Sequence, residues 1–183
     1  MNKPFLNPRF MIIALIILVA AAIRLIPHYP NFTPIAGMAL LGGSYFSNKK
    51  TAFIIPFVAM FLSDIIFGFH STMWAVYLSF ALIVMIGFSL RQSKKIYNIF
   101  LASVSASVLF FVITNFAVWI SGGIYPMSSS GLIECYIAAI PFFHYTLLGD
   151  LFYSGIFFGI FELVQYKFPS IVETRFSFPE EMI

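Results

Sequence analysis

Long apolar runs, joined by short turns that carry basic residues, are the feature that most limits what this chain can fold into. A helix needs about 20 apolar residues to cross a bilayer, with a range of roughly 17 to 25. Six segments approach this requirement, at residues 10–26, 34–46, 51–69, 73–90, 96–121 and 144–167. Only 9% of the 183 residues are charged, against about 25% in a soluble domain. We therefore expect an all-α integral membrane protein with six transmembrane helices in one bundle.

Turn residues mark the limits of several helices. Pro27 and Pro30 end the first span. The second span is expected to begin with Thr33 at the N-cap and Pro34 at the first helical position. The second helix spans only about 20 Å at 1.5 Å per residue, and it is rich in small residues that favour packing against other helices. Residues 132–143 are apolar but too short to cross. We expect them to form a short re-entrant or interfacial helix before the sixth span.

The basic residues indicate which way the bundle faces. With six spans both termini lie on one side, and all of the ten Lys and Arg residues except Arg24 fall on that side. By the positive-inside rule this side is cytoplasmic. The beginning of the chain also resembles a secretory signal peptide, but its apolar run continues to Ile26, so we expect an uncleaved span. Residues 1–167 then form the transmembrane domain, and residues 168–183 form a cytoplasmic tail.

The polar residues that are unusual for a membrane segment gather on the opposite, outer side. Ionisable groups inside a bilayer are costly, and they usually face the bundle interior or a cavity. We therefore expect a polar cavity that faces outward and is covered by the loops. Its candidate substrate-binding residues are Arg24, His28, Asn31, Asp64, His70, Trp74, Asn115, Trp119, Tyr125, His144 and Asp150.

The charged candidates allow more than one interpretation. Arg24 could reach lipid headgroups, hold an anion, or form an ion pair with Asp64 or Asp150 that orders the cavity. Asp64 is embedded in apolar sequence, which favours a structural or binding role inside the cavity, although it could also cap the loop at Gly68.

Two pairs of candidates are spaced four residues apart, which places them on one face if the segment is helical. His70 and Trp74 in that arrangement suit stacking on a flat ring, and the alternative is an interfacial aromatic belt. Asn115 and Trp119 combine an amide and an indole on one face, and the alternative is a hydrogen bond from Asn115 to another helix.

Known catalytic motifs are missing from the sequence. It contains no Gly-x-Ser-x-Gly, no His-Glu-x-x-His, no phosphate-binding loop and no Cys-x-x-Cys. We therefore expect a protein that is not an enzyme, has no cofactor or metal of its own and binds no nucleic acid. Two alternatives stay open: an intramembrane enzyme that uses a histidine with Asp64 or Asp150 for acid–base chemistry, and an assembly subunit that docks a partner helix at Gly155 and Gly159.

The segment from Pro30 to Gly68 carries a family resemblance. It consists of a loop, a short helix of small residues ending in Leu41-Gly42-Gly43, a basic turn, and a helix ending in Leu62-Ser63-Asp64-Ile65-Ile66-Phe67-Gly68. With the chain length, the six spans and the cytoplasmic ends, it resembles the S components of energy-coupling factor (ECF) vitamin transporters. These S components are membrane-embedded substrate-binding subunits.

The resemblance implies a multi-pass protein of a bacterial inner membrane that binds a vitamin-like molecule with high affinity. It also implies docking to a transmembrane coupling subunit that two ATPases drive. Members often carry Ala-x-x-x-Ala on the first helix for that docking. Here Ala14 is followed at the fourth position by Leu18, so a transporter that works alone stays open.

For the ligand, our first expectation is cobalamin or another corrinoid, and a flat heterocyclic vitamin is the alternative. The candidate axial ligands to a corrinoid cobalt are His28, His70, His144 and Cys135.

Overall fold

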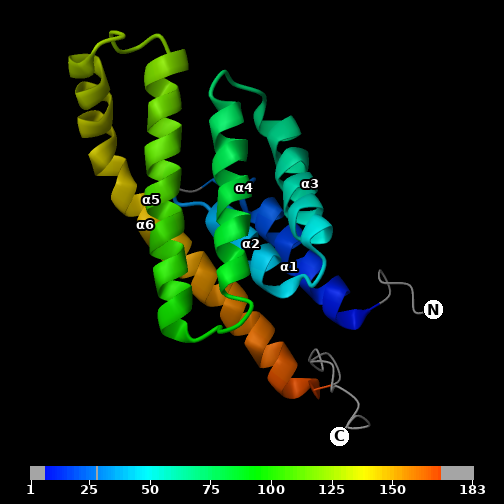
Figure 1. The fold of residues 1–183 in the computed structure, drawn as a ribbon. Coiled ribbons are helices and arrows are strands. Elements are labelled where there is room, and N and C mark those ends of the chain that lie inside the picture. Colours follow the sequence, from blue (N-terminus) through cyan, green and yellow to red (C-terminus); the bar gives the residue numbers. More distant parts are fainter. Residues whose placement is uncertain (1–6, 28, 170–183) are drawn as a thin grey trace, which may run out of the picture.

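The structure is a computed structural model, and it describes residues 7–27 and 29–169. The described residues form six α-helices and no strand, which confirms the all-α prediction. The helices are α1 (Pro8–Ile23), α2 (Ile35–Tyr45), α3 (Lys49–Phe67), α4 (Met73–Ser89), α5 (Ile96–Ser121) and α6 (Ser129–Lys167). Of these, α3, α5 and α6 are long and apolar enough to cross a membrane, and α1, α2 and α4 are shorter apolar helices. Successive helices alternate in direction, so α1 begins and α6 ends at the same end of the molecule (Figure 1).

The expected separate helix at residues 132–143 is wrong, because α6 runs without a break for 39 residues. The Ser128 hydroxyl caps its first turn by accepting a hydrogen bond from the Gly131 backbone N–H at 3.2 Å. Pro141 lies inside α6, but no glycine or polar capping residue accompanies it, so the helix continues past it. In Figure 1 the first part of α6 lies beside α5, and its later part slopes away across the bundle.

Helix α2 forms the centre of the bundle. All of its residues from Ile35 to Tyr45 are buried, and it packs against each of the other five helices. Its closest neighbour is α4, where a Cβ added to Gly43 would lie 2.2 Å from the Val84 carbonyl oxygen and 2.9 Å from the Gly87 Cα. The small residues of α2 therefore allow two backbones to approach closely, as the sequence predicted for a helix that packs inside the bundle.

A second pair of glycines lies on the surface. A Cβ added to Gly155 or to Gly159 on α6 would have no atom within 4 Å. Among the described residues, these two glycines therefore do not bring helices together.

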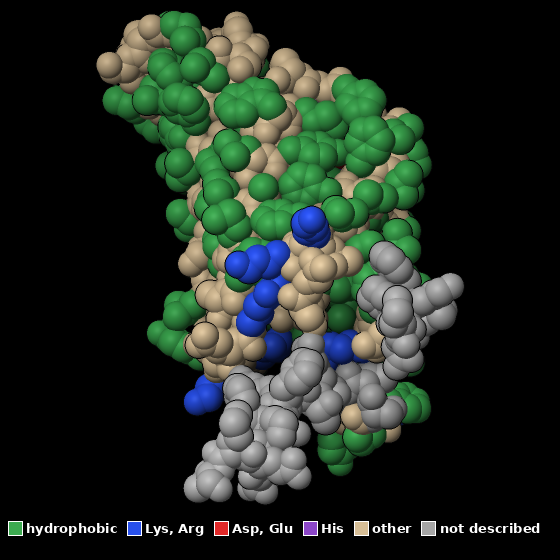
Figure 2. All heavy atoms as spheres, turned by 45° about the vertical axis from the view of Figure 1, so that its right-hand side comes forward, with side chains coloured by type: hydrophobic (Ala, Val, Ile, Leu, Met, Phe, Trp, Pro, Cys, Tyr) green, Lys and Arg blue, Asp and Glu red, His purple; other side chains and the backbone are tan. Residues whose placement is uncertain are grey.

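The charged residues divide the molecule into two ends. We call one the basic end, where α1 and α3 begin, α4 turns into α5, and α6 ends; its described cations are Arg9, Lys49, Lys50, Arg91, Lys94, Lys95 and Lys167. Figure 2 shows Lys and Arg side chains gathered on the lower part of one face, below a broad apolar surface. We call the other the loop end; it carries the connections at 68–72 and 122–128. Lys3 and Arg175 lie outside the described residues.

Arg91 binds the end of α2 at the basic end. It donates hydrogen bonds from Nε to the Gly43 carbonyl at 2.9 Å and from Nη2 to the Phe46 carbonyl at 2.7 Å. These carbonyls belong to the end of α2, where the helix leaves them without partners of its own. The guanidinium therefore supplies hydrogen bonds to two carbonyls at the end of the central helix.

Candidate functional site

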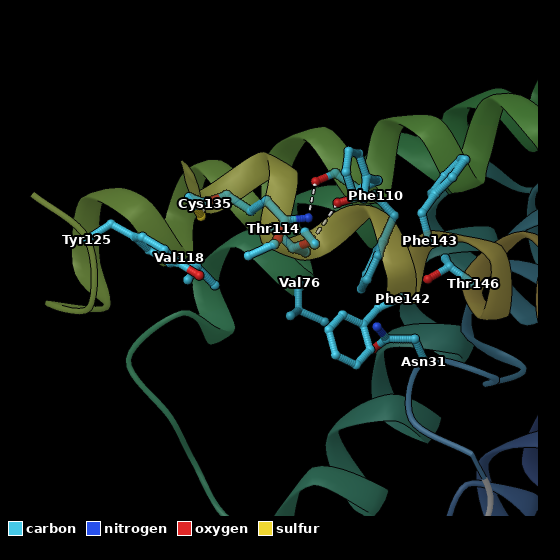
Figure 3. Close-up of a pocket in the computed structure, with 14 residues that line it drawn as sticks. Asn31, Val76, Phe110, Thr114, Val118, Tyr125, Cys135, Phe142, Phe143 and Thr146 are labelled. Atoms are coloured by element: carbon cyan, nitrogen blue, oxygen red, sulfur yellow. Dashed lines mark hydrogen bonds between the residues drawn. The ribbon is translucent and has the colours of Figure 1, made fainter. Parts of the chain in front are cut away.

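A cavity of about 450 Å³ lies between α5 and α6 in the half of the bundle nearest the loop end. We call it the α5–α6 cavity. Pockets for small molecules usually measure about 300–1,000 Å³. Helices α5 and α6 supply most of the lining, and α4 and two connecting segments complete it (Figure 3). The lining residues are Asn31, Val76, Phe110, Phe111, Thr114, Asn115, Val118, Tyr125, Cys135, Ala138, Ala139, Phe142, Phe143 and Thr146.

Side-chain size explains why the two helices leave a space between them. Ala138 and Ala139 present small side chains, whereas the pairs Phe110–Phe111 and Phe142–Phe143 supply large rings around them. The Phe111 ring packs on Phe143 with centroids 4.9 Å apart, so one wall of the cavity is held by contact between α5 and α6. A second tie is the Tyr136 hydroxyl, which donates to the Val112 carbonyl at 2.7 Å.

The connection between α1 and α2 supplies Asn31 to the cavity. Asn31 has a φ of 66°, a left-handed conformation that asparagine tolerates better than most residues. The next residues pack directly on α6, because a Cβ added to Gly149 would lie 3.1 Å from the Phe32 Cα and 3.1 Å from the Thr33 backbone nitrogen. Figure 3 shows Asn31 and Val76 across the cavity from the lining residues of α5 and α6.

The polar groups of the cavity include hydrogen-bond acceptors that the chain leaves free. The Asn115 amide nitrogen donates to the Phe111 carbonyl at 2.8 Å, and the Thr114 hydroxyl donates to the Phe110 carbonyl at 2.7 Å. The Cys135 thiol donates to the Asn115 carbonyl at 3.4 Å. One Asn115 amide hydrogen and the Thr114 hydroxyl hydrogen are therefore used within the chain, and the side-chain oxygen of Asn115 accepts no hydrogen bond from the described residues. None of the described lining residues is charged.

Arg24 and Asp64 form an ion pair outside the cavity. Arg24 Nη2 lies 2.9 Å from Asp64 Oδ1, and the side chains are 11% and 6% exposed. Arg24 Nη1 also donates to the Ser63 hydroxyl, and Tyr77 donates its hydroxyl to Asp64 Oδ2 at 2.8 Å. We call these four residues the Arg24 network. It joins α1, α3 and α4, and its burial excludes the headgroup-reaching arrangement of Arg24.

The side chain of Asp64 does not cap the loop at Gly68. The Gly68 backbone N–H donates to the backbone carbonyl of Asp64 at 2.9 Å, which is an ordinary helix end. Both carboxylate oxygens of Asp64 instead bind Arg24 and Tyr77. Of the two partners that the sequence allowed for Arg24, the structure therefore selects Asp64.

Asp150 occupies a separate buried position on α6. It is 3% exposed, and the Ser107 hydroxyl on α5 lies 2.7 Å from its Oδ2. Thr146, one turn earlier on α6, lines the cavity. Asp150 therefore lies one turn beneath the cavity, on the side of the basic end.

The remaining predicted site residues do not line the cavity. His70 is exposed in the loop before α4, with its Nδ1 3.0 Å from the Thr72 hydroxyl, so the shared helical face with Trp74 does not form. Trp74 is 48% exposed, and His144 is exposed against the ring of Tyr145. Trp119 donates its indole N–H to the Pro126 carbonyl at 3.0 Å and thereby ties down the loop between α5 and α6. His28 lies outside the described residues.

The structure thus brings together Asn31, Asn115 and Tyr125 from the predicted substrate-binding set, along with Cys135 from the candidate axial ligands. Sequence reasoning missed the contribution of Thr114, Thr146 and the phenylalanines. The sequence did carry a signal for this lining. Two adjacent phenylalanines occur on α5 and two on α6, and two adjacent alanines precede the pair on α6. Among the described residues, no three His, Cys, Asp or Glu side chains lie close enough to hold a metal ion.

Comparison with known proteins places most of the chain in one family. Residues 5–171 match the model of DUF6580, which is described as a family of unknown function. No curated protein and no solved structure matches the chain.

Proposed function

The chain belongs to DUF6580, a family of unknown function, so we propose a function from the cavity. We propose that the protein is a membrane subunit that binds a small, uncharged molecule with a flat ring and takes part in its uptake. The observation that carries this proposal is the lining of the α5–α6 cavity: aromatic faces and unused oxygen acceptors, without a charged side chain among the described residues.

The lining favours an uncharged ligand for a physical reason. A charged group loses its hydration when it enters such a cavity, and it needs a partner of opposite charge there to offset that cost. The cations and acids of the described residues lie elsewhere, with Arg24 and Asp64 already paired. Asn115 and Thr114 instead offer oxygens that suit N–H or O–H donors on a ligand, and the phenylalanines offer faces for a ring.

The placement in a membrane follows from helix lengths and charge. We infer six crossings with both ends cytoplasmic, because the described cations other than Arg24 lie at the basic end. This arrangement turns the cavity toward the outer face. The 17 residues of α4 reach about 26 Å, close to the roughly 30 Å of a bilayer core. The 11 residues of α2 reach only about 16 Å, but α2 is buried, so it makes its crossing inside the bundle and needs no contact with lipid.

The S component of an ECF vitamin transporter remains the kind of protein that we propose, in a bacterial inner membrane and with a coupling subunit and two ATPases as partners. A transporter that works alone is the alternative. The cavity volume favours a ligand of ordinary vitamin size over a complete corrinoid, which is several times larger than such a ligand. For a corrinoid, Cys135 is the candidate axial ligand in the lining.

The geometry favours binding over catalysis. An intramembrane enzyme needs a general acid or base within hydrogen-bond reach of its substrate. His70 and His144 are exposed outside the cavity, and Asp64 is engaged with Arg24 and Tyr77. The assembly-subunit alternative does not account for a cavity with this lining.

The test is to purify the protein in mild detergent, record its absorption spectrum and identify the small molecules released on denaturation by mass spectrometry. We expect one uncharged ring compound at a ratio near one per protein. A red corrinoid spectrum would instead support the larger ligand.

The variant Asn115→Leu removes the acceptor and fills part of the cavity, and it should retain about tenfold less ligand, which corresponds to roughly 1.4 kcal/mol. Asn98→Leu is the matched control, because Asn98 lies on the same helix near the basic end, where its amide donates to the Ser93 carbonyl at 3.2 Å. Equal ligand content in both variants, or a wild-type protein that carries and binds no small molecule, would refute the proposal.

A further inference from the structure

A group of buried polar side chains continues beneath the α5–α6 cavity. Ser107 on α5 contacts Asp150 on α6, and each has a serine four residues away on its own helix: Ser103 and Ser154. Residues four apart lie on the same face of a helix. Because α5 and α6 run in opposite directions (Figure 1), both of these serines lie one turn from the contact, toward the basic end. We call the four residues the α5–α6 polar cluster.

The contacts of the Ser107 hydroxyl indicate the protonation state of Asp150, because the hydroxyl has only one hydrogen. The Ser107 oxygen lies 2.7 Å from Asp150 Oδ2 and 3.0 Å from the Ser103 carbonyl oxygen. A carbonyl accepts only, and an ionised carboxylate also accepts only, whereas a hydroxyl has a single hydrogen to donate. Ser107 therefore cannot donate fully to both. Both short contacts are satisfied together if the carboxyl of Asp150 is protonated, so that it donates to Ser107 and Ser107 donates to Ser103.

The surroundings of Asp150 offer no compensating charge among the described residues. Asp150 is 3% exposed, and its polar partner there is Ser107. An isolated ionised carboxylate in such a place is strongly disfavoured, and the group becomes neutral instead.

The titratable groups on the helices that pack against α6 lie elsewhere. On α5 the titratable residue is Tyr97, in the first turn at the basic end. On α2 it is Tyr45, which donates its hydroxyl to Glu162 about three turns beyond Asp150. On α1, Arg9 lies over the Tyr45 ring at that same level. Arg24, which follows α1, is paired with Asp64.

Neighbouring groups on α6 and the connection before α2 also leave Asp150 without a counter-charge. His144 lies on Tyr145, and Tyr29 stacks on Tyr145 with centroids 5.6 Å apart. Tyr153 packs its ring against Phe32 and Phe157.

We propose that the α5–α6 polar cluster is a proton-binding site, in which Asp150 holds a proton taken from water and donates it in a hydrogen bond to Ser107. Loss of that proton returns it to water and leaves a carboxylate that must draw the Ser107 hydrogen away from the Ser103 carbonyl. Thr146 and Phe111, one turn above on α6 and α5, line the cavity, so a change in this hydrogen bonding acts on helix turns that contact the ligand.

The two outer serines of the cluster lie on its side toward the basic end. The side-chain oxygens of Ser103 and Ser154 are buried and have no hydrogen-bond partner among the described residues. Buried hydroxyls without partners are costly, which makes them expected positions for water in the hydrated protein. The polar cluster therefore reaches one turn below Asp150, toward the basic end.

The test is infrared spectroscopy of the full-length protein in detergent, because a protonated carboxyl has a carbonyl stretching band that an ionised one lacks. We expect this band near neutral pH, and we expect it to disappear in Asp150→Asn. Glu134→Gln is the matched control, since Glu134 is exposed on the same helix, and it should leave the band unchanged. Ser107→Ala should shift the band without removing it, because the carboxyl loses its hydrogen-bond acceptor.

Thermal unfolding shows whether the variants are folded. An asparagine at position 150 can donate its amide hydrogen to Ser107 as the protonated acid does, so its unfolding temperature should stay close to that of the wild type. The absence of the band at neutral pH would overturn the proposal. An unfolding temperature that rises with sodium chloride but not with choline chloride would also overturn it, because the site would then hold a sodium ion on an ionised carboxylate.

Discussion

Removal of the Asp64 carboxylate should destabilise the protein far more than the loss of a surface ion pair. In Asp64→Ala, Arg24 loses the partner that lies 2.9 Å from its Nη2, and Tyr77 loses the acceptor of its hydroxyl hydrogen at 2.8 Å. The Arg24 side chain is only 11% exposed, so water cannot easily replace the carboxylate. Its remaining hydrogen-bond partners are the Ser63 hydroxyl and the Met60 carbonyl, both uncharged, and the Phe67 ring centroid lies 5.5 Å from its Cζ.

The expected size follows from the burial of the pair. Exposed ion pairs contribute about 0–1 kcal/mol, whereas removing one partner of a buried pair costs about 3–5 kcal/mol because an uncompensated charge remains. For a protein of 150–250 residues, each kcal/mol lowers the unfolding temperature by about 2–4 °C. Asp64→Ala should therefore lower the unfolding temperature by about 6–20 °C.

The assay is thermal unfolding in detergent, followed by tryptophan fluorescence, for a set of variants. The double replacement Arg24→Met with Asp64→Leu removes both charges and fills the space with apolar side chains, so it should recover most of the loss. This comparison separates the cost of a stranded charge from the cost of lost packing. A drop below about 2 °C in Asp64→Ala, or a double variant no more stable than Asp64→Ala, would show that the network does not act as a buried ion pair.

Three further outcomes follow from individual contacts. Gly43→Ala should cost about 1–3 kcal/mol in unfolding free energy, because its new Cβ would lie 2.2 Å from a carbonyl oxygen of α4, whereas Gly155→Ala meets no atom within 4 Å and should have almost no effect. Arg91→Lys should lose one of the two hydrogen bonds to the end of α2 and speed amide hydrogen exchange at residues 44–48. Trp119→Phe keeps an aromatic side chain but loses the hydrogen bond to the Pro126 carbonyl, so a bound ligand should dissociate roughly fivefold faster, and the free energy of unfolding should fall by no more than about 1 kcal/mol.

Much of the fold was predictable because it depends on composition and on local signals. Long apolar runs between polar turns indicate helices, and Pro34, Asn48 and Ser128 lie at or beside the starts of α2, α3 and α6. The prediction failed at residues 132–143, where length alone suggested a separate helix. A proline without neighbouring stop signals does not end a helix, and the contacts of α6 with α5 extend across the junction.

The cavity was predicted only in part. The sequence indicates at which end of the bundle a residue lies, but a cavity also depends on the direction in which each side chain points. Asn115 and Tyr125 were expected at the loop end, and both line the cavity. His70, Trp74 and His144 share that end, but their side chains lie on its surface, since proximity along the membrane normal does not decide which way a side chain points.

The amino-acid sequence by itself determined the helical class, the positions of most helix ends and the gathering of basic residues at one end, because these follow from hydrophobicity, backbone preference and charge along the chain. Only the tertiary structure decided that Arg24 pairs with Asp64 and that Asp150 faces Ser107. These contacts join residues about 40 positions apart, and they depend on how helices are rotated and set against one another. That arrangement results from the packing of the whole bundle around α2, so no short stretch of sequence contains it.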